Sequence, residues 1–539
     1  MNYQIHSQTL NTISSLQMNE FLLPTSISKT VLEEALVTQF SLHEDAPRTI
    51  QRNYRDTFDW RLYKKGFLFQ VDKHSHSYEL NLIPLDIGRR RVLTMQSQPT
   101  YIEDIPSKIW QQQLQGVLDI RALMSHITIS LRQNTLRYVD KDGKTLSRIY
   151  IEEARLSQPN GRLKTLETRI RIVPITGYGK SSEQISKFLK KEFKLKAAKQ
   201  VPFYPSAKAL GLSVNNYNSQ LSHPFSAKDR TDRALKALLL TLLDTMEVNE
   251  QGTVEDVDSE FLHDLRVSVR RTRSVLSQIK HIFPQRSLQR FEGGFSWVGQ
   301  ITGPTRDMHV YLLKFDNYQS ALPKKMQPHL LPLKEFLIRH QKLEHEKLIA
   351  VIKSNRYQVL KQSWRTFLTS PCPEKTSLEN ATKAISETAD THIWQAYSKL
   401  IKRGSAITAS CPDEKLHKLR IVAKKLRYLL EFFQSLYPKS RIKSLISTLK
   451  KLQDVLGDFQ DLSVQIDALK GFEIQMKEEG SLNPDTEAAI ELLVQQLQSH
   501  IKAQRKLFET RFVEFSDKNM RSEFKLLFKK SPTKSQAVK

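Results

Sequence analysis

The chain has 539 residues, with 83 lysines and arginines against 57 aspartates and glutamates and a formal net charge of +26. This length allows two to four domains with their own cores, and the charge predicts an anionic partner without identifying it. Two cysteines without a C-x-x-C motif exclude a disulfide scaffold and a cysteine-based zinc or redox site. No apolar run is long enough to span a bilayer, and the first ten residues lack the features of a signal peptide. We therefore expect a cytoplasmic protein that does not contact membranes.

The first 199 residues alternate strand-like apolar runs with turn signals, which predicts an α+β domain. Strands are predicted at Phe67–Val71, His126–Leu131 and Arg169–Val173. The dipeptide Asp142-Gly143 predicts a hairpin turn between two strands. Helices are expected near residues 29–39, 107–118 and 182–198.

Residues 200–226 are rich in proline, serine, asparagine and tyrosine and lack hydrophobic periodicity, which predicts a linker. Residues 227–528 show helical patterns separated by short breaks, as in antiparallel helix bundles. The predicted helices are 229–246, 261–282, 288–299, 308–317, 327–354, 381–401, 414–436, 442–456, 462–478 and 484–528. A proline- and serine-rich joint divides this region into halves at about 227–370 and 380–528, and residues 529–539 are expected to be a disordered tail.

A basic motif occurs twice in the helical region. HDLRVSVRRTR begins at His263, and HKLRIVAKKLR begins 154 residues later at His417. A second pair of motifs keeps this offset, because GPTRD begins at Gly303 and GDFQD begins at Gly457. Two matches at one offset indicate a duplicated structural unit.

Each copy of the basic motif places four cationic residues on one face of a helix. They stand at positions i, i+3, i+7 and i+10, within an arc of roughly 80°. Like charges at this spacing destabilise a helix by about 0.2–0.5 kcal/mol per pair, so a face that repeats them is expected to bind an anion. We name the two sets the first basic stripe and the second basic stripe: His263, Arg266, Arg270 and Arg273, and His417, Arg420, Lys424 and Arg427.

The alternative interpretation is a solvated charged face, which is what most charge runs are. Around the second stripe, however, apolar residues stand on both sides, with leucines such as Leu419 on one side and Ile421 and Tyr428 on the other. A helix that is apolar almost all round is buried. We therefore expect the stripe to face an internal channel or groove and Tyr428 to point away from it. The side of the helix exposed to water is expected to be Lys418, Val422 and Lys425.

These motifs resemble the CHAD family, the conserved histidine α-helical domain, over about residues 225–525. The resemblance rests on both basic motifs, on RDMHV from Arg306, on KKLRYLLEFF from Lys424 and on LKKLQDVLGDFQDL from Leu449. It implies two pseudo-symmetric four-helix bundles around a basic channel that binds inorganic polyphosphate, with no catalytic activity and no cofactor. The implied binding residues are the two basic stripes with the adjacent Arg271 and Lys425, and Arg306, Asp307 and Asp461 are expected to support them.

The first 199 residues resemble a divergent CYTH domain, the barrel-like antiparallel fold of the triphosphate tunnel metalloenzymes. The similar stretches are YRDTFDWRLYKKGFLF from Tyr54, VPITGY from Val173 and SAKALG from Ser206. The family's E-x-E-x-K motif, which supplies metal-binding carboxylates and a phosphate-binding lysine, is replaced by Leu16, Met18 and Glu20, and its L-R-x-R motif is replaced by LFQV from Leu68. We therefore expect a catalytically degenerate domain without a metal site.

Two smaller groups are weaker candidates for chemistry. His74 and His76 have no third ligand at a typical spacing, so a surface loop is the better interpretation than a metal site. Glu152 and Glu153 could be carboxylates of a tunnel, yet an exposed acidic pair is the commoner arrangement.

Polyphosphate bound along both stripes should be released by salt, because counterion release drives such binding. His263 and His417 predict tighter binding as the pH falls through about 6–7. Three alternatives stay open. A nucleic-acid-binding protein is disfavoured because the stripes contain no aromatic residues. A metal-dependent triphosphatase would act through the first domain, and a scaffold would be directed to polyphosphate granules. No specific nucleic acid is expected, and protein partners and oligomeric state are unknown.

Overall fold

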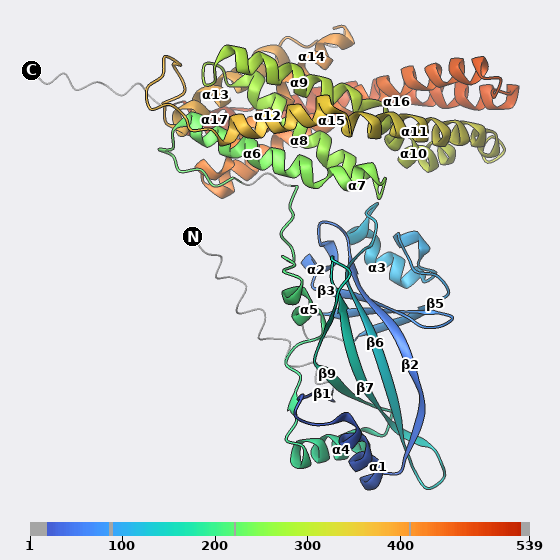
Figure 1. The fold of residues 1–539 in the computed structure, drawn as a ribbon. Coiled ribbons are helices and arrows are strands. Elements are labelled where there is room, and N and C mark those ends of the chain that lie inside the picture. The colour runs from blue at the N-terminus through green and yellow to red at the C-terminus, as the bar shows by residue number, and fades with distance from the viewer. Residues whose placement is uncertain (1–18, 86–89, 220–222, 409–410, 530–539) are drawn as a thin grey trace, which may run out of the picture. The chain divides into compact units, whose positions relative to one another are not determined.

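The computed structural model of the chain describes residues 19–85, 90–219, 223–408 and 411–529. The chain folds into two compact units, Met1–Asn218 and Ser219–Lys539 (Figure 1). In the described ranges, no helix has both the length and the apolar character needed to cross a membrane. The expected tail lies outside the described residues apart from Lys529.

The N-terminal unit is built on one antiparallel sheet with the strand order β10-β1-β9-β7-β6-β2-β3-β4-β5, and β8 pairs with β7. The strands are β1 Asn19–Leu23, β2 Leu42–Asp56, β3 Phe67–Lys73, β4 Tyr78–Pro84, β5 Arg91–Met95, β6 Met124–Val139, β7 Thr145–Ser157, β8 Leu163–Thr165, β9 Thr168–Pro174 and β10 Lys196–Ala197. The predicted antiparallel α+β domain is confirmed. The sheet is not a closed barrel, however, because among the described residues no pairing joins β10 to β5.

Helices cover one face of this sheet. α1 (Lys29–Gln39) and α4 (Gly179–Glu192) pack against the buried isoleucines of β7 and β9, and α2 (Arg61–Lys64) and α3 (Lys108–Leu118) pack against β3 and β4. Because side chains alternate along a strand, Glu152 points to the opposite face from its neighbour Ile151. At one end of that opposite face, α5 (Phe203–Ala209), which lies in the expected linker, packs Phe203 against the sheet.

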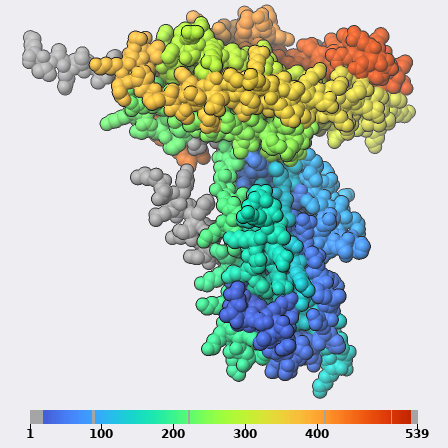
Figure 2. All heavy atoms as spheres, in the orientation of Figure 1, coloured from blue at the N-terminus to red at the C-terminus, as the bar shows by residue number. Residues whose placement is uncertain are grey.

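The C-terminal unit is helical apart from an isolated antiparallel β-bridge between Arg230 and Ala384. Its elements are α6 Thr231–Val248, α7 Glu250–Val254, α8 Ser259–Gln278, α9 Gln285–Ile301, α10 Gly303–Ala321, η4 Gln327–Leu330, α11 Leu331–Ile352, α12 Asn355–Thr369, α13 Ile385–Gly404, α14 Asp413–Phe433, η5 Gln434–Leu436, α15 Lys439–Glu478, α16 Pro484–Phe515 and α17 Lys518–Phe528. In the space-filling view, side chains fill the spaces between these ribbons, and the red residues of α16 form one end of the unit (Figure 2).

The helical unit is an internal duplication with a pseudo-two-fold axis. α6, α8 and α9 begin 154 residues before α13, α14 and α15, which is the offset of the repeated motifs. Two backbone hydrogen bonds of 3.0 and 2.8 Å run reciprocally across the axis, from the Thr231 N–H to the Lys383 carbonyl and from the Ile385 N–H to the Asp229 carbonyl. Positions 231 and 385, and positions 229 and 383, are again 154 residues apart. Such reciprocal bonds are typical of a contact between two equivalent surfaces.

Two hydrophobic cores hold the helical unit together, and each draws helices from both halves of the duplication. The smaller core joins α10 and α11 of the first half to α15 and α16 of the second half, through residues such as Phe315, Phe336 and Phe472. The larger core joins α6, α8, α9 and α12 to α13, α14 and α17. The halves are therefore not independent bundles that could separate.

Several predicted helix boundaries were wrong. The helices predicted at 442–456 and 462–478 form one continuous helix, α15, that passes through Gly457. The helix predicted at 327–354 ends at Ile352, and α12 was missed. The last predicted helix is divided into α16 and α17, because Asp517 caps α17 by accepting a hydrogen bond from the Met520 N–H.

Candidate functional site

The two basic stripes lie on α8 and α14, which pack against each other. Each of these helices buries a leucine-rich face in the larger core, including Leu265 of α8 and Leu419 of α14. At the start of α8, Asp258 accepts a hydrogen bond from the Glu260 N–H at 2.9 Å. Because the helices are fixed by their apolar faces, the positions of their cationic residues follow from the helical spacing.

Residues of both stripes line a first cavity of about 360 Å³, which we call the axial cavity. Pairs of equivalent residues from the two halves line it, namely Arg266 with Arg420 and Asp307 with Asp461, so the cavity lies on the pseudo-two-fold axis. Its complete lining is His263, Arg266, Arg270, Arg306, Asp307, Val310, Tyr311, Lys314, Arg420, Asp461, Val464 and Gln465.

A second cavity of about 450 Å³, which we call the lateral cavity, shares Arg270 with the axial cavity. Arg270 and its equivalent Lys424 both line the lateral cavity, together with three serines of α8 and α9. Its complete lining is Arg270, Arg273, Ser274, Ser277, Glu292, Ser296, Ile421, Lys424, Lys425 and Tyr428. The two cavities thus present cationic groups of both halves on either side of one exposed arginine, Arg270.

The first stripe lines the cavities over its whole length, whereas the second does so only in its middle. Arg420 lines the axial cavity and Lys424 the lateral cavity. Beyond them, a ring nitrogen of His417 lies 2.6 Å from the Gln460 side-chain oxygen, and Arg427 pairs with Glu431 at 3.4 Å. Neither residue is among the lining residues of the two cavities.

Of the two residues expected beside the stripes, Lys425 lines the lateral cavity and Arg271 lines neither cavity. Arg271 instead donates a hydrogen bond of 2.8 Å to the Ser219 carbonyl and pairs with Glu431 at 3.6 Å. The guanidinium of Arg271 is thereby tied to an acidic side chain and to the start of the helical unit.

In the first half, Arg266 and Arg306 of the axial cavity donate hydrogen bonds to neutral acceptors, and Arg306 also lies 3.9 Å from the Glu260 carboxylate. Arg266 donates to the Gly299 carbonyl at 3.1 Å and to the Thr302 hydroxyl at 2.7 Å, and Arg306 donates to the Ser259 carbonyl at 2.9 Å. Burial lowers the pKa of Arg266 to about 10 and also lowers the pKa of Arg306. Both guanidinium groups stay charged near neutral pH in an environment that disfavours their charge.

Among the residues of the second stripe, Lys424 lies in an environment that disfavours its charge. Burial lowers its pKa to about 8, and the neighbouring cations Arg420 and Arg270 lower it further, while Asp461 opposes them. An anion placed beside a half-buried amine that is surrounded by guanidinium groups favours the charged form of the amine. The site is therefore electrostatically poised for an anion.

In the second half, a carboxylate holds the arginine of the axial cavity. Arg420 donates to Asp461 at 2.9 Å. Position 456, which is equivalent to Thr302, is a leucine and offers no hydroxyl. On the first-half side, burial raises the pKa of Asp307, with Arg266 and Arg306 opposing the rise. Asp461 and Arg420 thus form a direct ion pair.

Two expectations about α14 were wrong. Tyr428 does not point away from the basic residues, because it lines the lateral cavity. Val422 does not meet water, since only 4% of its surface is exposed, whereas Ile421 is 43% exposed. The water-facing strip of α14 therefore includes Ile421 rather than Val422.

Sequence reasoning missed several residues of the cavities. Lys314 stands on α10 eight residues after Arg306, which would have placed it on the same helical face once the start of α10 was known. Ser274 and Ser277 stand four and seven residues after Arg270, so they continue the spacing of the first stripe with hydroxyl groups. Ser296 and Glu292 come from α9 and had no signal in the motif.

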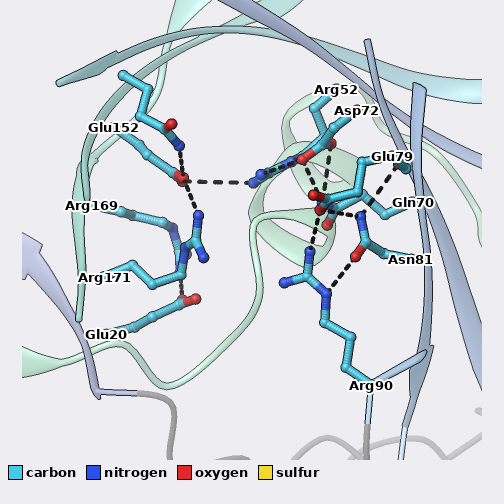
Figure 3. Close-up of polar contacts among 11 residues, drawn as sticks. Glu20, Arg52, Gln70, Asp72, Glu79, Asn81, Arg90, Glu152, Arg169 and Arg171 are labelled. Atoms are coloured by element: carbon cyan, nitrogen blue, oxygen red, sulfur yellow. Dashed lines mark hydrogen bonds and ion pairs between the residues drawn. The ribbon is translucent and has the colours of Figure 1, made fainter. Parts of the chain in front are cut away.

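The second candidate region is the face of the N-terminal sheet opposite to α1–α4, where buried arginines and carboxylates form a network of ion pairs (Figure 3). Arg52 makes two hydrogen bonds of 2.9 and 2.8 Å to Asp72 and lies 3.7 Å from Glu152. Arg171 donates to Glu152 at 3.0 Å, and Gln133 donates to Glu152 at 2.9 Å. Burial alone would raise the pKa of Glu152, but Arg52 and Arg171 outweigh it and hold the pKa at about 2.

The outer members of this network are paired in the same way. Arg169 lies 3.4 Å from Glu20, and Arg90 lies 3.3 Å from Glu79 and donates to Asn81 at 2.6 Å. Glu152 is therefore not part of an exposed acidic pair, and only Glu153 reaches the surface, 3.0 Å from Lys29.

The residues of this interior do not fit a divalent metal ion. Mg²⁺ and Mn²⁺ require several carboxylate or carbonyl oxygens free to converge on one point. Here each carboxylate of the network faces a guanidinium group, and the described residues contain no group of three or more histidine, cysteine or acidic side chains that could hold a metal. His74 and His76 lie in the loop between β3 and β4 and belong to no such group.

In comparisons with known proteins, the helical unit matches a protein family. Residues 237–470 match the family model of the CHAD domain. A crystal structure of the CHAD domain from the plant Ricinus communis is similar, with 22% identity, a TM-score of 0.46 and coverage of 54% of this chain and 95% of that chain. PptA from Streptomyces chartreusis is 16% identical, with a TM-score of 0.42 and coverage of 53% and 99%. A putative adenylate cyclase from Bacillus halodurans is 17% identical, with a TM-score of 0.25 and coverage of 35% and 94%. No curated protein matches the chain.

Proposed function

Because residues 237–470 of this chain form a CHAD domain, a family associated with polyphosphate binding, we propose that the helical unit binds inorganic polyphosphate in the axial and lateral cavities without catalysing a reaction on it. The observation that carries the proposal is the convergence of both basic stripes on two cavities that share Arg270. A flexible chain with about one negative charge per phosphate unit can follow such a path, and arginine forks suit phosphate oxygens.

Binding in this path would use side chains of different chemistry in its two parts. The axial cavity offers guanidinium groups and the lateral cavity adds Lys424, Lys425 and serine hydroxyl groups, which can donate to phosphate oxygens.

A nucleic acid is the main alternative anion. Tyr428 and Tyr311 do line the cavities, so the expected lack of aromatic residues does not hold. Both rings are almost completely buried, with 9% and 6% of their surfaces exposed, and offer little face on which a base could stack. We therefore favour polyphosphate over single-stranded nucleic acid.

The test is a titration of the full chain with long-chain polyphosphate, with double-stranded DNA as competitor. Arg270→Gln and Lys424→Gln should each weaken polyphosphate binding about tenfold or more, roughly 1.4 kcal/mol, and lower the slope of log affinity against log salt by about 1. Arg403→Gln and Lys399→Gln are matched controls, because both residues are exposed on α13 and line neither cavity. Equal losses in the controls, or DNA that displaces polyphosphate at similar charge concentration, would contradict the proposal.

We also propose that the N-terminal domain hydrolyses no triphosphate, because its interior carboxylates are neutralised by arginines and offer no metal site. The alternative, a metal-dependent triphosphatase, predicts phosphate release from triphosphate with Mg²⁺ or Mn²⁺. A colorimetric phosphate assay on the full chain distinguishes the two. Release that survives Lys424→Gln but is lost on Arg52→Gln would establish the alternative.

A further inference from the structure

The axial cavity contains two carboxylates in a lining that is otherwise cationic or neutral. Asp461 and Asp307 stand at equivalent positions of the two halves, and both line the cavity with the arginines of the stripes. An anion-binding cavity gains nothing from carboxylates that face its ligand, since like charges raise the free energy of the complex. Their presence therefore calls for a role in the empty cavity.

The two halves hold their equivalent arginines in different ways. Arg266 is held by a carbonyl and a hydroxyl, which carry no net charge and leave its positive charge available to a ligand. Arg420 has a leucine at the position equivalent to Thr302 and donates instead to Asp461. A hydrogen bond between ionised partners is roughly twice as strong as a neutral one, so Arg420 is compensated in the empty cavity.

The Asp461 side chain can move away from Arg420 without disrupting the fold. It lies within the continuous helix α15, its side chain is 52% exposed, and it lines the cavity rather than the hydrophobic core. A half-exposed pair is screened by water, so its separation has a small free-energy cost compared with that of a buried pair. The Asp461 carboxylate can thus exchange with another anion.

We propose that Asp461 is a built-in competitor of phosphate: its carboxylate takes the place on Arg420 that a phosphate oxygen would take, and this makes the cavity selective for long polyphosphate over short phosphates. The inference rests on the proposed function of the cavities. A short anion must displace Asp461 to gain Arg420 and has few other contacts. A long chain contacts cations in both cavities at once. Competition by Asp461 therefore lowers its binding free energy by a smaller fraction.

The experiment compares Asp461→Asn with the unmodified full chain by calorimetric titration, using inorganic tripolyphosphate and long-chain polyphosphate as probes. Asparagine keeps the size and the hydrogen-bonding oxygen of the side chain and removes its charge. We expect tripolyphosphate to bind Asp461→Asn about fivefold more tightly and long-chain polyphosphate to gain about twofold or less. Asp467→Asn is the matched control, because it removes the same charge from an exposed position on α15 that lines neither cavity.

The outcomes separate this inference from the proposed function. Weaker or unchanged tripolyphosphate binding by Asp461→Asn would overturn the inference, because Asp461 would then position Arg420 or be indifferent to the ligand. An equal gain for both probes would overturn the selectivity. If the unmodified chain binds no long-chain polyphosphate, the proposed function fails, and the tripolyphosphate comparison still shows whether Asp461 competes.

Discussion

Polyphosphate binding should weaken above about pH 8, because Lys424 must be charged to contact phosphate. Burial lowers the pKa of Lys424 to about 8, with Arg420, Arg270 and Arg427 lowering it and Asp461 raising it. A bound phosphate adds the opposite charge and so favours the ammonium form. Deprotonation of Lys424 and binding of the anion therefore oppose each other.

The size of this effect follows from proton linkage. If only the ammonium form binds, the apparent Kd rises by a factor of about 1 + 10^(pH − 8), which is roughly tenfold, or ~1.4 kcal/mol, between pH 7 and pH 9. The folding stability of the ligand-free protein depends on pH in the opposite sense. Between about pH 8 and the ordinary lysine pKa of about 10.4, the unfolded chain binds more protons at this position, so the contribution of Lys424 to stability increases with pH.

Isothermal titration of long-chain polyphosphate between pH 6.5 and 9.5, at constant ionic strength, measures this prediction. Lys424→Arg should bind with a flat profile over the same range, because a guanidinium group stays charged. Lys399→Arg, on the exposed face of α13, should keep the profile of the unmodified chain. A flat profile in the unmodified chain, or the same decrease in Lys424→Arg, would refute the role assigned to Lys424.

Other predictions concern stability and the limits of the site. Glu152→Gln should destabilise the N-terminal unit by about 3–5 kcal/mol in denaturant unfolding, because it removes the buried carboxylate that pairs with Arg171 and one of the two carboxylates beside Arg52, whereas the neighbouring Glu153→Gln should cost less than about 1 kcal/mol. Gly404→Ala should lower the thermal midpoint of the helical unit, since its added Cβ would overlap the Phe512 ring, at a cost of about 1–3 kcal/mol, and Gly471→Ala, with open space around it, should not. Arg271→Gln should weaken polyphosphate binding less than Arg270→Gln does in the same titration, because Arg271 already pairs with Glu431.

The sequence predicts the duplicated helical unit well because its signal is local and repeated. The spacing of His263, Arg266, Arg270 and Arg273 fixes a common helical face, and the offset of 154 residues predicts the equivalent positions that meet at the axis. What the spacing cannot give is the direction from which neighbouring helices approach. The expectations for Tyr428 and Val422 were wrong for this reason, since burial of a helix flank depends on contacts with distant helices.

The N-terminal interior was less predictable because its contacts depend on strand register. Arg52 and Asp72 are direct partners in the pairing of β2 with β3, and Glu152 and Gln133 are direct partners in the pairing of β6 with β7. A shift of one residue would turn each of these side chains to the other face. The degenerate site expected from the motifs stays a prediction, and the partners of the interior carboxylates could be found only from the register of the sheet.

The pseudo-two-fold axis adds an argument about the ligand that charge alone does not provide. Arg266 and Arg420 face the axial cavity from equivalent positions, so a strand entering from either side meets similar groups. A linear polyphosphate has the same order of atoms in both directions along the chain. Its successive units can therefore occupy equivalent positions around such an axis. A nucleic acid strand has chemically different ends and a repeating unit with a direction, so it cannot present the same groups to both halves. The equivalent positions of Arg266 and Arg420 thus support the proposed polyphosphate ligand over a nucleic acid. The different partners of Arg266 and Arg420, neutral in one half and charged in the other, are the feature that breaks this equivalence.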